Sequence, residues 1–238
     1  MNNVYLGSET RKDQKKKRLI LEELNLSILR LLKNEWSRGR VIALDIETSV
    51  VDPDNFLTNE RILAISFARR VSGQFMESRG ILVKTIFLDD DDDESEKRLL
   101  ENLDKELSDV KPLGVVGFGV RFYDIPLLVI KRRYHKLLLW KLIDLAESTA
   151  IIDLYHILKY RGYKKLEEVL SSQEFAHLPF KRTKHLVSAD REKKRGEVYR
   201  LWKEDRETLR EYSEGEVHDL LLLAEHLAFG GGHRGRYT

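Results

Sequence analysis

A short apolar segment that ends in two acidic residues constrains this chain most. The segment VIALDIETS, residues 41–49, opens with four apolar residues, which is typical of a strand buried on both faces. Side chains two apart in a strand point to the same side, so Asp45 and Glu47 are expected to project together. Neighbouring carboxylates repel each other unless a cation lies between them, and Mg²⁺ prefers oxygen ligands. The segment therefore predicts a divalent-cation site, with exposed acids past the strand's end as the alternative.

The composition excludes several other kinds of site. The chain has 238 residues, of which 42% are hydrophobic, enough for one globular core. It contains no cysteine, which excludes disulfides, thiolate zinc sites and cysteine nucleophiles. The charged fraction of 34% is typical of thermophile proteins, and the net charge of +2 favours no class of partner. No apolar run approaches the roughly 20 residues that span a bilayer, so we expect a cytoplasmic protein with no membrane partner.

The pattern of apolar residues predicts an α/β chain with a mixed sheet flanked by helices. Strands are expected over residues 41–44, 62–68, 81–88, 113–118 and, at an edge, 151–154. Helices are expected over residues 18–36, 94–109, 124–139, 155–159, 164–170 and 209–229. Because three successive strands precede the second helix, we expect a β-meander to open the sheet.

Charged and glycine-rich segments divide the chain into a basic tail with an N-terminal helix (1–37), a main domain (38–229) and a flexible tail (230–238). The basic residues 1–17 are interpreted as a solvated tail or as an arm that contacts phosphates. The acidic run 89–94 is interpreted as a helix start, where negative charge suits the helix dipole. Residues 175–207 are highly charged with weak periodicity, and we expect an irregular or mobile segment.

A second motif places an acid where a strand gives way to a helix. The segment GFGVRFYDIPLL, residues 117–128, follows one expected strand and opens the next expected helix. Asp124 lies near the N-terminus of that helix, where an acid is either a helix cap or a functional carboxylate. Tyr123 beside it is either a core residue or part of a site.

A third motif lies on the last expected helix. Tyr212, Glu216 and Asp219 are spaced i, i+4 and i+7, so one helix face carries a phenol and up to two carboxylates. The alternative is a solvated polar stripe on an amphipathic helix. Gly215 inside a helix costs about 1 kcal/mol relative to alanine, which indicates a close backbone approach or a later helix start.

Taken together and in this order, the three motifs resemble the Exo I, Exo II and Exo III motifs of DEDD 3′–5′ exonucleases of the tyrosine subclass. The chain is most similar to the exonuclease domain of family-B DNA polymerases and to its stand-alone relatives. The resemblance covers roughly residues 40–228 and includes Ile152-Asp153-Leu154 and Lys165-Leu166 between the second and third motifs. It implies a ribonuclease-H-like fold, here with an N-terminal helical extension.

The resemblance also implies a reaction and its residues. The reaction is two-metal hydrolysis of phosphodiester bonds from the 3′ end of DNA, preferably single-stranded. The implied ligands of two Mg²⁺ or Mn²⁺ ions are Asp45, Glu47, Asp124 and Glu216, with Asp219 as an alternative ligand. Tyr212 is implied to orient the attacking water. The implied substrate-binding positions are Thr48, Gly119 and Tyr123.

Two departures from the family pattern keep other functions open. Gly119 stands where the family has an asparagine that holds the terminal nucleotide, and Glu216 stands where it has an aspartate. A catalytically impaired accessory protein that binds nucleic acid or a replication or repair partner is one alternative, and an exoribonuclease is another. Three basic clusters are expected either to line a nucleic-acid groove or to be solvated, at residues 131–133, 181–182 and 193–195.

Overall fold

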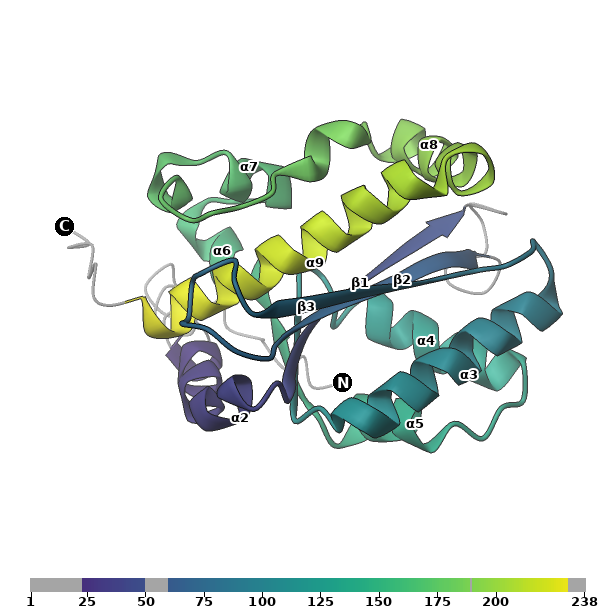
Figure 1. Ribbon diagram of the computed structural model, residues 1–238, viewed down its shortest axis with the longest axis horizontal. Helices are drawn as coiled ribbons and strands as arrows, with labels where there is room; N and C mark the ends of the chain where they lie inside the picture. The colour runs from purple at the N-terminus through teal and green to yellow at the C-terminus, as the bar shows by residue number, and fades with distance from the viewer. Residues whose placement is uncertain (1–22, 50–59, 189, 231–238) are drawn as a thin grey trace, which may run out of the picture.

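The computed structural model describes residues 23–49, 60–188 and 190–230 (Figure 1). The expected basic tail 1–17 and all of the expected flexible tail 230–238 except Gly230 lie outside the described residues. A helical segment over 23–31 and α2 (Lys33–Ser37) precede the sheet, as expected for the N-terminal extension. Within the described residues, no helix is long and apolar enough to cross a membrane.

Five strands form one mixed sheet in the order β3-β2-β1-β4-β5. The antiparallel meander consists of β1 (Val41–Ser49), β2 (Arg61–Arg70) and β3 (Ile81–Phe87). On the other side of β1, β4 (Gly114–Gly117) and the edge strand β5 (Ala150–Asp153) run parallel to it. The meander, the mixed sheet and the edge strand at 151–154 are therefore confirmed.

Helices cover both faces of this sheet (Figure 1). The long α9 (Arg206–Phe229) crosses one face, and α3, α4 and α5 lie beneath the other. The remaining bounds are α3 (Asp93–Val110), α4 (Asp124–Tyr134), α5 (Trp140–Glu147), α6 (Leu154–Leu158), α7 (Leu166–Leu170) and α8 (Arg191–Glu204), with short 3₁₀ helices η1 (Lys159–Arg161), η2 (Gln173–Phe175) and η3 (Thr183–Leu186). This arrangement is a ribonuclease-H-like α/β fold.

Side chains of β1 alternate between two apolar cores. Val41 and Ala43 pack in the core that contains the apolar face of α9. Ile42 and Leu44 pack in the core between the sheet and α3. Because the alternation continues along the strand, Asp45 and Glu47 are directed to the same side as Val41 and Ala43, which is the side of α9.

The expectation of an irregular or mobile segment over 175–207 is wrong. Its second half contains α8, a 14-residue helix, and its first half contains η2 and η3. Val198, Leu201 and Trp202 are buried, and the Trp202 indole donates a hydrogen bond to the Leu88 carbonyl at 2.9 Å. These apolar residues are few and stand among charged ones, so the periodicity of the helix is concealed in the sequence.

Other expected helices differ at their ends. The helix expected over 124–139 ends at Tyr134, and a separate helix, α5, follows that the sequence analysis did not predict. The final helix begins three residues early because the Asp205 side chain caps it through the Thr208 backbone N–H. The acidic run is confirmed as a helix start, since Asp92 caps α3 by accepting from the Ser95 N–H at 2.7 Å.

Candidate metal and catalytic site

The paired acids of β1 lie inside the strand rather than past its end. Strand pairing continues to Ser49, with an irregularity in register between Glu47 and Thr48. Glu47 is only 3% exposed and Asp45 is half-buried. The alternative of solvated acids beyond the strand is therefore wrong.

Three carboxylates meet between β1 and α9. Ligand oxygens of Asp45, Glu47 and Glu216 all lie within 4.8 Å of one another. One oxygen of Asp45 (Oδ2) and one of Glu47 (Oε1) are buried and have no hydrogen-bond partner among the described residues. Buried polar atoms left without partners cost free energy, and a hard divalent cation accepts such oxygens as ligands. The donor set therefore fits Mg²⁺ or Mn²⁺.

The fourth predicted carboxylate approaches from α4. Asp124 is the first residue of that helix and is buried, while Tyr123 occupies the N-cap position. Burial, followed by the negative charges of Asp45 and Glu47, raises the pKa of Asp124 well above its usual range. Burial and the neighbouring Asp45 also raise the pKa of Glu47, although Lys194 opposes the shift. Asp124 therefore lies close enough to Asp45 and Glu47 for their negative charges to raise its pKa.

The third motif contributes a phenol and a carboxylate from one face of α9. Tyr212 and Glu216 are both buried, so the solvated-stripe alternative is wrong for this part of the helix. Burial, followed by the charge of Glu47, raises the pKa of the Tyr212 hydroxyl above its usual value. The phenol therefore keeps its proton at neutral pH and remains a hydrogen-bond donor.

Two lysines enter this site from the segment that sequence analysis expected to be irregular. Lys184 of η3 donates a hydrogen bond to the Tyr212 hydroxyl at 2.9 Å and forms a close ion pair with Glu216. Lys194 of α8 lies 3.4 Å from Glu47, and its side chain is 32% exposed. Both ammonium groups also lie over the Tyr212 ring, at 4.8 and 5.3 Å from its centroid.

The pKa values of the two lysines shift in opposite directions. Burial, together with the positive charge of Lys194, lowers the pKa of Lys184 to about 8. Burial also disfavours the charged form of Lys194, but Glu47 and Asp45 outweigh it and raise the pKa of that group. Lys194 belongs to the predicted basic cluster 193–195, whereas Lys184 stands in no pattern that would have identified it.

Asp219, the alternative metal ligand, holds a backbone turn instead. Its two carboxylate oxygens accept the backbone N–H groups of Lys181 and Arg182 at 2.8 and 2.9 Å. Gly215 explains how closely this turn approaches α9, because a Cβ there would lie 2.1 Å from the Thr183 hydroxyl oxygen. Of the two explanations for Gly215, close approach is thus confirmed and a later helix start is wrong.

A cavity of about 210 Å³ opens beside Glu47, between the end of β1 and α8. Thr48 and Tyr123 line it, and their hydroxyl oxygens are 2.8 Å apart. Tyr123 also bonds the buried Glu60, which accepts from Arg195 at 3.1 Å. The remaining lining residues are Ile46, Glu47, Lys194, Arg195 and Val198. Two of the three implied substrate positions thus share one cavity with two cationic side chains.

Gly119 is not among the lining residues of that cavity. It has a left-handed backbone conformation (φ +89°), and a Cβ at this position would meet nothing within 4 Å. Its N–H donates to Asp153 at 2.8 Å, which fixes the turn before α4. No neighbouring group therefore takes the place of the side chain that the family's asparagine would have at this position.

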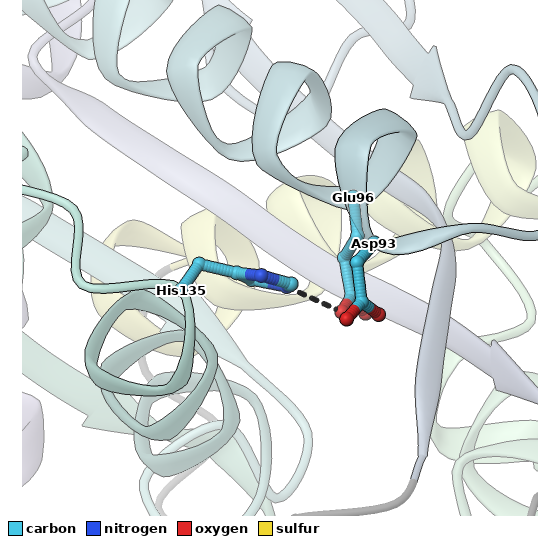
Figure 2. Close-up of side chains that lie close together, drawn as sticks. All are labelled: Asp93, Glu96 and His135. Carbon is cyan, nitrogen blue, oxygen red and sulfur yellow. Dashed lines mark hydrogen bonds and ion pairs between the residues drawn. The ribbon is translucent and has the colours of Figure 1, made fainter.

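A second acidic cluster lies on the other face of the sheet, between α3 and the end of α4. Figure 2 shows the Glu96 and Asp93 carboxylates together, with the His135 ring directed at Glu96. Glu96 accepts hydrogen bonds from His135 and from the Ile62 N–H, both at 2.8 Å. It also pairs with Arg61 at 3.2 Å and with Lys131 at 3.3 Å.

These partners leave the Glu96 cluster with no need of an added cation. Lys131 is itself buried, so both expectations for this residue, a place along a nucleic-acid groove and a solvated side chain, are wrong. We therefore assign this cluster to the stability of the fold rather than to a site.

The fold and the buried carboxylates define an α/β protein of the ribonuclease-H-like class with a candidate cation site on its central strand. Among solved structures, the chain is similar to the family B DNA polymerase from the hyperthermophilic archaeon Pyrobaculum calidifontis, with a TM-score of 0.58 and 21% sequence identity. The similarity covers 79% of this chain but only 24% of the polymerase chain. No protein-family model and no curated protein matches the sequence. The likeness therefore shows a shared fold.

Proposed function

We propose that the chain is a metal-dependent 3′–5′ exonuclease that acts on the 3′ end of DNA, preferably single-stranded. The observation that carries the proposal is the buried group of Asp45, Glu47 and Glu216, in which two oxygens have no partner among the described residues. In support of the three-motif resemblance, the charges of Asp45 and Glu47 help to raise the pKa values of Asp124 and Tyr212. The polarity and the DNA substrate come from the resemblance.

The residues of the site would have different roles in hydrolysis. Asp45, Glu47, Asp124 and Glu216 would hold divalent cations, which supply a Lewis acid for the phosphate and an activated water when bound. Tyr212, whose raised pKa keeps it protonated, would donate a hydrogen bond and orient the attacking water. Thr48 and Tyr123 would contact the terminal nucleotide in the adjoining cavity, with Arg195 near its phosphate.

The direct test is nucleotide release from single-stranded DNA labelled at its 3′ end, with and without Mn²⁺. The wild type is expected to release labelled mononucleotides only with the metal. The double variant Asp45→Asn/Asp124→Asn is expected to lose at least about 10³-fold in rate, roughly 4 kcal/mol. Asp144→Asn on α5, which removes an exposed carboxylate, is the matched control. Release that survives the double substitution would overturn the proposed site, and a matched RNA oligomer tests the exoribonuclease alternative.

A second candidate function is a non-catalytic module that binds nucleic acid. The ion pair between Lys184 and Glu216 favours it, because a lysine can neutralise the acids without a metal. Gly119, which lacks the asparagine side chain, also favours it. In this case the protein would bind single-stranded DNA with a steep salt dependence and release no nucleotide under any metal.

A further inference from the structure

Lys184 occupies part of the group that the resemblance assigns to metal ions. Its ammonium pairs with Glu216 and bonds the Tyr212 hydroxyl, while Asp45 and Glu47 are close enough to favour its charged form. In this way Glu216 already has a cationic partner. Asp45 and Glu47 each keep one buried carboxylate oxygen without a partner among the described residues, although the other oxygen of Glu47 lies 3.4 Å from Lys194.

The position of Lys184 is fixed by contacts of the three residues that precede it. The preceding turn is held by Asp219, which accepts two successive backbone N–H groups. Arg182 in this turn has a left-handed backbone (φ +55°), a conformation that such contacts must maintain. Next along the chain, the Thr183 hydroxyl donates to the Tyr212 carbonyl at 3.2 Å and packs against Gly215. Lys184 is thus a built component of the site, unlike a lysine on a solvated surface.

The charges of the site are matched by a single divalent ion. Once a bound cation favours their ionised forms, Asp45, Glu47, Asp124 and Glu216 carry four negative charges, and Lys184 with Lys194 supplies two positive charges. Two negative charges remain, which one Mg²⁺ or Mn²⁺ neutralises. A second divalent ion would make the group of side chains and ions cationic, and it would have to displace the ammonium of Lys184 from Glu216.

We propose that Lys184 takes the place of one of the two metal ions, so that the chain binds one divalent cation through Asp45 and Glu47, with Asp124 beside them. The inference rests on the proposed metal site and narrows its composition. Glu216 is then the anchor of the lysine rather than a metal ligand. Its extra methylene relative to aspartate extends its carboxylate toward η3.

Lys184 is a positioning residue in this arrangement. Because the Tyr212 oxygen accepts a hydrogen bond from Lys184, the phenol proton is directed to another acceptor. The attacking water is the acceptor that hydrolysis would supply. Lys184 therefore orients Tyr212 in addition to neutralising Glu216.

The test is the stoichiometry of Mn²⁺ binding, measured by calorimetry and by electron paramagnetic resonance of unbound Mn²⁺, without nucleic acid. The wild type and the control Lys105→Met, which removes an exposed lysine of α3, are expected to bind one ion per chain. Lys184→Met is expected to bind two, and Lys184→Arg is expected to restore one. Two ions or none in the wild type, or a single ion in Lys184→Met, would overturn the inference.

A second pair of variants tests the ligand assignment even if Lys184→Met fails to fold. Asp45→Asn is expected to weaken Mn²⁺ binding at least about tenfold more than Glu216→Gln does, because Glu216 acts on the ion only through Lys184. Equal losses in the two variants would overturn the inference. Because no nucleic acid is present, an inactive protein that binds one ion contradicts only the proposed function. An active protein that binds two ions contradicts only the role of Lys184.

Discussion

Two buried carboxylate clusters lie on opposite faces of the same sheet and differ in how fully their charges are compensated. Glu96, which is fully buried, is bonded by a histidine, a backbone N–H, an arginine and a lysine. The group around Asp45 and Glu47 retains buried oxygens without partners among the described residues. In both clusters the potential ligand atoms lie within 4.8 Å of one another. The comparison teaches that the unmet hydrogen-bonding capacity of the acids, rather than their number, distinguishes a site from a structural network.

The largest expected effect comes from breaking the compensated cluster. Glu96→Gln removes the negative charge that Arg61 and the buried Lys131 face and weakens the hydrogen bond with His135. We expect the free energy of unfolding to fall by about 3 kcal/mol, as when one partner of a buried ion pair is removed. Urea denaturation measures it, with the exposed Asp90→Asn as the matched control. A loss below about 1 kcal/mol, the value typical of a surface pair, would contradict the structural role.

The next effect concerns added metal. Mn²⁺ at about 100 times its dissociation constant should stabilise the wild type by about 2.7 kcal/mol, because only the folded state assembles the ligands. Glu96→Gln should show the same gain on its lower baseline, whereas Asp45→Asn should show little or none. Thermal unfolding with and without Mn²⁺ makes the comparison. A gain that disappears in Glu96→Gln would reverse the assignment of the two clusters.

The smallest effect is a gain in stability from removing a functional acid. The pKa of Asp124 is raised in the folded state by burial and by Asp45 and Glu47, so ionising it costs folding free energy. This cost is absent below the unfolded-state pKa of about 4 and grows as pH rises through the folded-state pKa. Asp124→Asn should therefore stabilise the metal-free protein at pH 7 by about 1 kcal/mol, and the gain should vanish toward pH 4. Denaturation curves across this pH range give the sign, and a destabilised variant at pH 7 would contradict it.

The sequence predicts the strand that carries the site because two local rules suffice there. An apolar run fixes β1 as buried, and the two-residue period places Asp45 and Glu47 on one side. The i, i+4 spacing likewise places Tyr212 and Glu216 on one face of α9. These relations hold within single elements and need no knowledge of tertiary contacts.

The cationic half of the site could not be predicted in the same way. Lys184 lies on a four-residue 3₁₀ helix, and its burial results from packing against α9, which no local period encodes. The same limit applies to Lys131, whose basic cluster resembles a solvated patch until α3 supplies Glu96. A lysine is usually exposed, so a buried one is recognised only when its partner in space is known.

The contact between Gly215 and Thr183 links the evolution of two positions that are far apart in the sequence. A methyl group at 215 would overlap the Thr183 side chain, whose atoms lie between 2.1 and 3.0 Å from the place it would take. Homologous proteins that have alanine at position 215 should therefore also have a smaller residue than threonine at position 183. Such covariation would mark η3 and α9 as neighbours in relatives known from sequence alone.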